Sequence, residues 1–272
     1  MLRLQVLIMP LLAGLLTASV SAGLPIARFQ SVLGNFDVLL DPAAAPISVT
    51  NFASYANRGV YDGTVIHRST TYNPATIQIV QGGGFFVSNN TFPNNIPVQA
   101  PIVLETNRSN VRGTIAMART SLPDSATSQW FFNLIDNTPL DPGTPTGGYA
   151  VFGDVLGQGM KVVDRIGSAV VYNATNQLGS AFSELPLVDG NWLIIFPEIR
   201  VAPFAITNIT RTADTTELRW TALSSNTPVR VERTADLAGE PWTTIASNNT
   251  TGTFSDTNAP ARGAYYRLVT EP

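Results

Sequence analysis

The 272-residue sequence contains no cysteine, a single histidine (His67) and a single lysine (Lys161). The lack of cysteine excludes a disulfide scaffold, thiol catalysis and a lipid-modified N-terminal cysteine. Metal centres that need several His or Cys ligands are excluded by the same counts. The formal net charge is −3 and the arginines are scattered, so there is no basic patch for nucleic acid and no polybasic membrane anchor. Stability must therefore come from a buried core.

The usual catalytic motifs are also missing. There is no Gly-x-Ser-x-Gly nucleophile elbow, and a serine triad would have to use His67, which falls in a strand-like run beside Arg68. No stretch has the alternating carboxylates of a calcium-binding loop. Gly157 and Gly159 precede a helix-like segment, but Val162 stands at the third glycine position of a dinucleotide fingerprint. The sequence thus predicts neither a metal nor a cofactor.

Long apolar runs are confined to the N-terminus. Residues 1–22 combine one arginine, an apolar run over residues 4–16 and a final stretch of small residues, the pattern of a secretory signal cleaved after Ala22. Cleavage removes one positive charge and no acid, which changes the net charge from −3 to −4. The run is short for a membrane span, and an uncleaved anchor is the alternative. We expect an exported product, periplasmic or extracellular, with no membrane attachment after cleavage.

The remaining sequence changes composition near Ala202-Pro203. Residues 26–201 contain many short strand-like runs and two helix-like segments, 46–58 and 158–166, which predicts a mainly β domain built as a closed antiparallel barrel. Residues 203–272 carry strand-like runs at short, regular spacing, typical of a small β-sandwich. We expect its core to contain Trp220, Trp242, Tyr265 and Tyr266. Its ligand is unknown: attachment or spacing is one interpretation, and a stable tail that binds no ligand is the alternative.

Five motifs in the first domain carry a family resemblance. In chain order they are GVYDGTVIHR (59–68), VQGGGF (80–85), GTIAMART (113–120), DSATSQWFFNLIDN (124–137) and GYAVFG (148–153). Together they closely resemble the cyclophilins, which are peptidyl-prolyl cis-trans isomerases, and in particular their exported bacterial-type branch. The resemblance implies a closed eight-stranded antiparallel barrel capped by two helices, a groove on its outer surface, no cofactor, and proline-containing polypeptides as substrates. The C-terminal segment resembles fibronectin type III-like sandwiches.

The same resemblance assigns roles to individual residues. Arg68, directly after His67, matches the essential arginine of the family. Gln81 and Gln129 match groove residues that hold the peptide backbone. Ala118 and Phe131 match the floor and wall of the proline pocket. The other expected substrate-binding residues are His67, Gln78, Ile79, Met117, Arg119, Leu140 and Tyr149.

These residue types suit the isomerisation of an X-Pro bond. Rotation must break amide resonance, and the barrier is about 18–20 kcal/mol. The twisted prolyl nitrogen becomes a better hydrogen-bond acceptor, which a rigid guanidinium can stabilise more than it stabilises either planar state. Neither a nucleophile nor a metal is needed. We expect His67 to support Arg68 rather than to act as an acid or a base.

The sequence also departs from the family pattern. Twelve residues separate Arg68 from Gln81, so residues 69–76 carry an insertion relative to the usual spacing. Gln78 stands where an aromatic wall is usual, which would weaken proline burial by about 1–2 kcal/mol, unless Tyr72 of the inserted loop supplies a ring. Pro139 stands where cyclosporin-sensitive relatives have tryptophan, so we expect weak cyclosporin binding. Two other functions therefore stay open: a catalytically weak proline-peptide-binding or scaffolding module, and an adhesion protein that acts through residues 203–272.

Overall fold

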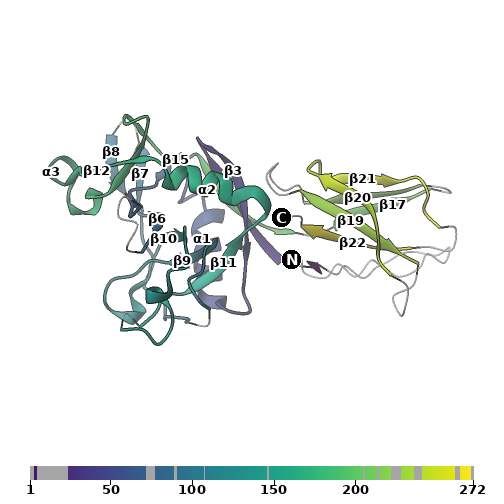
Figure 1. Ribbon diagram of the computed structural model, residues 1–272, viewed down its shortest axis with the longest axis horizontal. Helices are drawn as coiled ribbons and strands as arrows, with labels where there is room; N and C mark the ends of the chain where they lie inside the picture. Colours follow the sequence, from purple (N-terminus) through teal and green to yellow (C-terminus); the bar gives the residue numbers. More distant parts are fainter. Residues whose placement is uncertain are drawn as a thin grey trace.

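The computed structural model describes residues 3–4, 24–71, 77–88, 91–106, 108–145, 147–204, 206–212, 215–221, 228–235, 241–260 and 264–270. Figure 1 shows a first unit with helices and strands, followed by a second unit of strands alone. Of the predicted signal segment, only Arg3–Leu4 is described; it forms strand β1, which pairs with Leu268 and Val269. No helix in the described part of the chain is long and apolar enough to cross a membrane.

The first unit is built on an eight-stranded antiparallel sheet. Its strand order is β16 (Glu198–Phe204), β2 (Leu24–Ser31), β3 (Gly34–Leu40), β11 (Val151–Val155), β9 (Thr114–Met117), β10 (Trp130–Asn133), β6 (Ile79–Gly82) and β5 (Arg68–Ser69). A four-stranded sheet contains β15 (Ile195–Phe196), β4 (Thr64–Val65), β7 (Phe85–Ser88) and β8 (Thr91–Asn95). A three-stranded sheet contains β12 (Val170–Tyr172), β13 (Leu185–Val188) and β14 (Trp192–Leu193).

The eight-stranded sheet curls around the core but is open, so the predicted closed barrel is wrong in this respect. Its edge strands, β16 and β5, do not pair with each other. The segments that precede them, β15 and β4, pair instead within the four-stranded sheet, with Ile195 opposite Val65. Proline explains part of the break: Pro197 separates β15 from β16 and has no N–H group to donate to a ladder.

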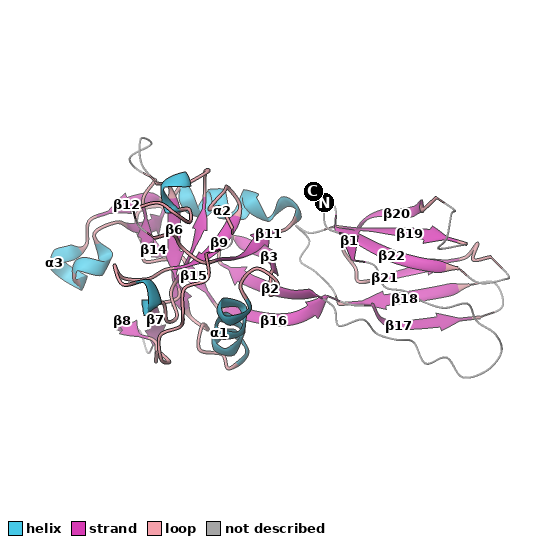
Figure 2. Ribbon diagram, turned by 90° about the horizontal axis from the view of Figure 1, so that it is seen from below, coloured by secondary structure: helices cyan, strands magenta, loops and turns pink. Residues whose placement is uncertain are grey.

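Two helices pack against this sheet, close to the segments that the sequence predicts. Helix α1 (Pro46–Asn57) and helix α2 (Met160–Gly167) lie on opposite sides of it (Figure 2). Helix α1 begins at a proline, and the Glu105 carboxylate accepts hydrogen bonds from the N–H groups of Ile47 and Ser48 at 3.0 and 2.8 Å. These contacts satisfy N–H groups that a helix start leaves unpaired. A short third helix, α3 (Thr175–Leu178), was not predicted.

Aromatic rings fill the inner face of the curled sheet. The ring of Phe29 lies 4.9 Å from that of Phe36 and 5.3 Å from those of Trp130 and Phe132, measured between centroids. All four side chains are fully buried. Side chains alternate along a strand, so the neighbouring Phe131 must face outward. It belongs to a separate apolar cluster, so Phe131 and Phe132 face opposite ways, as the alternation of side chains predicts.

The second unit consists of two antiparallel sheets. One contains β1, β22 (Tyr265–Thr270), β19 (Val229–Thr234) and β20 (Thr243–Asn249), and the other β17 (Ile206–Arg211), β18 (Thr216–Trp220) and β21 (Thr253–Asp256). Trp220 and Tyr266 are buried between them, as predicted. Trp242 instead lies against Arg267, whose guanidinium carbon is 4.3 Å from the ring centroid.

The two units share an apolar cluster. Ile26, Leu39 and Leu156 of the first unit belong to the same buried cluster as Ile206 and Leu218 of the second. Strand β16 runs through the predicted boundary at residues 202–203 and ends at residue 204. The division of the chain into domains stays a prediction.

We expect Phe29→Ala to lower the free energy of unfolding by about 3–5 kcal/mol, because it leaves a cavity among rings that cannot collapse together. Urea unfolding of the purified protein measures the effect. Leu122→Ala is the matched control, since this side chain is 67 % exposed and its loss should change stability by less than about 0.5 kcal/mol. A loss of less than about 1 kcal/mol for Phe29→Ala would contradict the central place of this ring.

Candidate functional site

The expected site residues meet on the outer face of three neighbouring strands, β5, β6 and β10. In the antiparallel registers, Arg68 lies opposite Gln81, and Gln81 lies opposite Phe131. Phe131 in turn lies opposite Ala116 of β9. Because directly opposite residues share a face of the sheet, these four side chains form one row across the outer surface. β6, β10 and β9 are seen side by side in Figure 1.

An apolar cluster lies at one end of this row. It consists of the buried Ile79, Ala116, Phe131, Leu140 and Val151, with the partly buried Ile77, Ala118 and Tyr149 packed against it. The rings of Phe131 and Tyr149 meet edge to face with centroids 5.6 Å apart. The cluster is separate from the main core, and its partly buried members, Ile77, Ala118 and Tyr149, are the ones that reach the surface.

Gln81, which belongs to the row, contacts a second glutamine, Gln129, through its side chain. The side-chain amide of Gln81 donates to the Oε1 atom of Gln129 at 2.8 Å. Gln129 precedes β10, and its main-chain oxygen accepts from the N–H group of Ala118 at 2.9 Å. Both amide side chains are partly exposed, so their remaining donors and acceptors can contact the backbone of an extended peptide.

His67 directly precedes β5 and is 2 % exposed. Its ring meets that of Phe85 edge to face, with centroids 4.9 Å apart. Burial, and secondly the charge of Arg68, lower the pKa of His67 to about 4, although a side-chain hydrogen bond with Gln129 acts to raise the pKa. The imidazole is therefore neutral near pH 7, which fits a supporting role and not acid–base chemistry.

Arg68 is half-exposed and makes an ion pair that the sequence did not indicate. Its Nε atom lies 2.7 Å from the Oε2 atom of Glu184. Glu184 follows the short 3₁₀ turn Ser180–Phe182 and precedes β13. No motif in the sequence could have identified it, because the pairing depends on contact between segments that are far apart in the chain.

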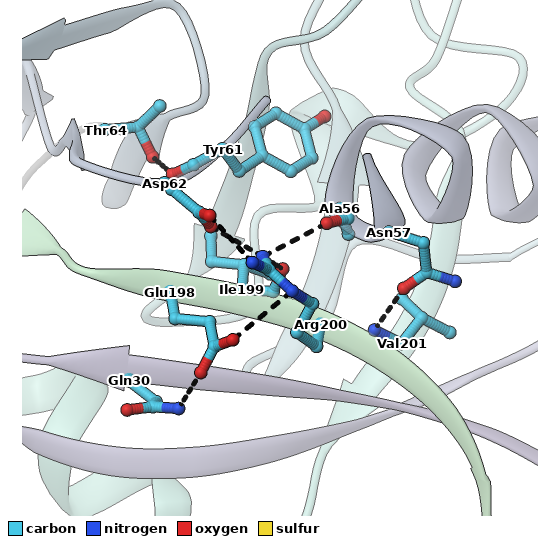
Figure 3. A network of polar contacts seen from close by, with 10 residues as sticks. All are labelled: Gln30, Ala56, Asn57, Tyr61, Asp62, Thr64, Glu198, Ile199, Arg200 and Val201. Atoms are coloured by element: carbon cyan, nitrogen blue, oxygen red, sulfur yellow. Dashed lines mark hydrogen bonds and ion pairs between the residues drawn. The ribbon is translucent and has the colours of Figure 1, made fainter. Parts of the chain in front are cut away.

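The turn that leads into β4 and Arg68 is held by a network of charges (Figure 3). The guanidinium of Arg200, on β16, binds both carboxylate oxygens of Asp62 at 2.6 and 2.7 Å. It also donates to the main-chain oxygen of Ala56 at 3.2 Å and lies 3.3 Å from Glu198. Gln30 donates to the same glutamate. The network ties helix α1, the turn and the edge strand together.

Two predicted substrate-binding residues lie elsewhere. Met117 is 1 % exposed and packs in the main core, because alternation along β9 places Ala116 and Ala118 on the outer face instead. Gln78 lines a separate hollow of about 540 Å³, with Thr71, Arg112 and residues of helix α2. Its main-chain groups bond the side chain of Asn137.

Ile77, which the sequence reasoning missed, takes the outer position that was expected of Gln78. It lies two residues before Ile79 and packs against the same cluster. The alternation of side chains could have indicated it. Tyr72, the other candidate for the missing wall, lies outside the described residues.

Arg119, another predicted substrate-binding residue, lies beside Tyr149 at the edge of the apolar cluster. Its Nη2 and Nε atoms donate to the main-chain oxygen of Gly148 at 2.7 and 3.1 Å. Its guanidinium carbon lies 4.6 Å from the centroid of the Tyr149 ring. Within the described residues there is no group of three or more His, Cys, Asp or Glu side chains that could hold a metal ion.

Comparison with known proteins places this site in a family context. The family model described as cyclophilin type peptidyl-prolyl cis-trans isomerase/CLD matches residues 26–180. Peptidyl-prolyl cis-trans isomerase A of Dickeya dadantii is 46 % identical over 140 residues, which cover 52 % of this chain and 70 % of that protein. A peptidyl-prolyl cis-trans isomerase of Acinetobacter baylyi is 42 % identical over 157 residues, covering 57 % and 78 %.

A solved structure was also compared. A Cryptosporidium parvum cyclophilin type isomerase, crystallised in the presence of the dipeptide Ala-Pro, aligns with a TM-score of 0.49 and 18 % identity. The alignment covers 65 % of this chain and 98 % of that one.

The lowered pKa of His67 predicts a loss of stability in acid. The unfolded chain takes up a proton at this residue below about pH 6.5, whereas the folded chain does so only near about pH 4, so stability falls as the pH falls between these values. The loss amounts to about 3 kcal/mol at most. Unfolding free energies measured at several pH values for the wild type and for His67→Gln give the difference. Since His67 is the only histidine, equal pH profiles for the two proteins would refute this prediction.

Proposed function

The chain belongs to the cyclophilin family and is a peptidyl-prolyl cis-trans isomerase, and we propose that it acts on exported proteins as they fold, with Arg68 as its catalytic residue. The observation that carries the proposal is the row of Arg68, Gln81 and Phe131 on the outer face of the sheet. Phe131 belongs to the apolar cluster at one end of this row. Isomerisation of an X-Pro bond requires a charged donor, an amide that binds the peptide backbone, and a site for the prolyl ring.

The proposed mechanism assigns a separate task to each part of the row. The apolar cluster around Phe131 holds the prolyl ring, while Gln81 and Gln129 hold the peptide backbone. As the bond twists, the prolyl nitrogen loses conjugation and accepts a hydrogen bond from the guanidinium of Arg68. This contact is stronger in the twisted state than in either planar isomer, so it lowers the barrier.

Two observations favour catalysis over simple peptide binding or scaffolding. The first is Ile77, which packs on the cluster where the sequence suggested that a wall was missing. The second is Arg68, which lies in the row directly opposite Gln81 and is partly exposed to a ligand. The second unit offers no comparable site among its described residues, so its role as a spacer or attachment module stays a prediction.

Export is supported by the N-terminal segment. Strand β2 begins at Leu24, two residues after the expected cleavage point at Ala22, so cleavage leaves the eight-stranded sheet complete. Among the described residues, cleavage would remove the pairing of β1 with β22.

We expect Arg68→Ala to lower kcat/KM by about 100-fold or more, the usual effect of removing one donor to a transition state. A protease-coupled assay on an Ala-Pro peptide measures the rate. Arg219→Ala is the matched control, because Arg219 is an exposed arginine of the second unit that also pairs with a glutamate. Wild-type activity in Arg68→Ala would refute the assigned role.

We expect the chain, expressed with its N-terminus in a Gram-negative host, to be recovered outside the cytoplasm beginning at Gly23. Mass spectrometry of the purified product identifies the end. Ala22→Arg should leave the longer chain, because cleavage sites require small residues. Recovery of the uncleaved wild type from the cytosol would rule out export.

A further inference from the structure

We infer that Glu184 is a positioning residue for Arg68, whose carboxylate holds the Nε side of the guanidinium and leaves the two terminal nitrogens for the substrate. The inference rests on the proposed catalytic role of Arg68. It concerns a residue beyond the segment that matches the family model, which ends at residue 180.

Glu184 is attached to strand β5 at two neighbouring points. Its Oε2 atom lies 2.7 Å from the Nε atom of Arg68, and its main-chain oxygen accepts from the N–H group of Ser69 at 2.8 Å. The Glu184 side chain is 19 % exposed, against 42 % for Arg68. The carboxylate is thus the more buried partner, and the arginine is the one that reaches towards solvent.

Buried neighbours on both sides fix the position of this carboxylate. Phe182 is 1 % exposed, and its ring lies 4.7 Å from that of Phe85 and 5.2 Å from that of Phe92. Leu185, on the other side, is 3 % exposed and pairs with Tyr172 in the three-stranded sheet. A residue between two such anchors has little freedom to move.

A fixed carboxylate matters because an arginine side chain has many rotamers. A half-exposed arginine without a partner must be ordered each time it stabilises the twisted bond, and that cost adds to the barrier. An Nε contact orders the guanidinium plane in advance. Among the described residues, neither terminal nitrogen of Arg68 has a hydrogen-bond partner, so both can face a bound peptide.

The carboxylate also has an opposing effect, since it offsets part of the positive charge that the substrate meets. That effect is small here, because water screens a pair in which one partner is half-exposed. Ordering therefore outweighs the loss of charge, and the pair should raise the rate.

The experiment compares Glu184→Ala and Glu184→Gln with the wild type. We expect Glu184→Ala to lower kcat/KM about fivefold to tenfold, equivalent to about 1–1.4 kcal/mol, with most of the change in kcat. Glu184→Gln should keep at least half of the activity, because its amide oxygen still accepts from the Nε atom. Glu217→Ala breaks the exposed pair with Arg219, at 2.7 Å, and is the control that should have no effect.

A double-mutant cycle separates positioning from general structural damage. In an Arg68→Ala background, Glu184→Ala should cause no further loss, since there is no guanidinium left to position. An equal loss in both backgrounds overturns the inference, as does wild-type or higher activity of Glu184→Ala. If Arg68→Ala is itself fully active, the proposed catalytic role fails and this inference fails with it.

A measurement on the unmutated enzyme keeps the inference testable if Glu184→Ala does not fold. The Nε–H proton of Arg68, assigned by its absence from the Arg68→Ala spectrum, should exchange slowly with water and faster in Glu184→Gln. Fast exchange in the wild type would show that the contact does not order the side chain and would overturn the inference.

Discussion

The alternation of side chains along β10 is the constraint on which both the core and the site depend. Trp130 and Phe132 face the inside of the curled sheet, where they meet Phe29. Phe131, between them, faces outward and forms the centre of the apolar cluster. The side chain that would hold the prolyl ring is therefore fixed by the packing of its two neighbours. The position of Phe131 in the candidate site thus depends on the packing of the core.

Local patterns in the sequence predicted much of this arrangement. The helix over residues 46–58 and the opposite directions of Phe131 and Phe132 both follow from spacing within one stretch of chain. The same alternation should have excluded Met117, which lies next to Ala118 on a strand. A match to a family position does not by itself tell which face of β9 the side chain occupies.

Other features depend on contacts between distant segments, which spacing does not reveal. The sheet is open because β15 pairs with β4, whereas the edge strands β16 and β5 do not pair, and no local pattern describes that pairing. Glu184 lies 116 positions after its partner, so only the folded chain brings the two together.

The apolar cluster shared by the two units affects the range of positions that the catalytic site can reach. A catalyst on a flexible tether explores a range of distances, and its local concentration near a fixed target falls as the tether lengthens. Ile26 and Leu39 instead belong to the same buried cluster as Ile206, and this contact restricts how far the site can move relative to the second unit. Any surface that binds the second unit would then limit which prolines can reach Arg68.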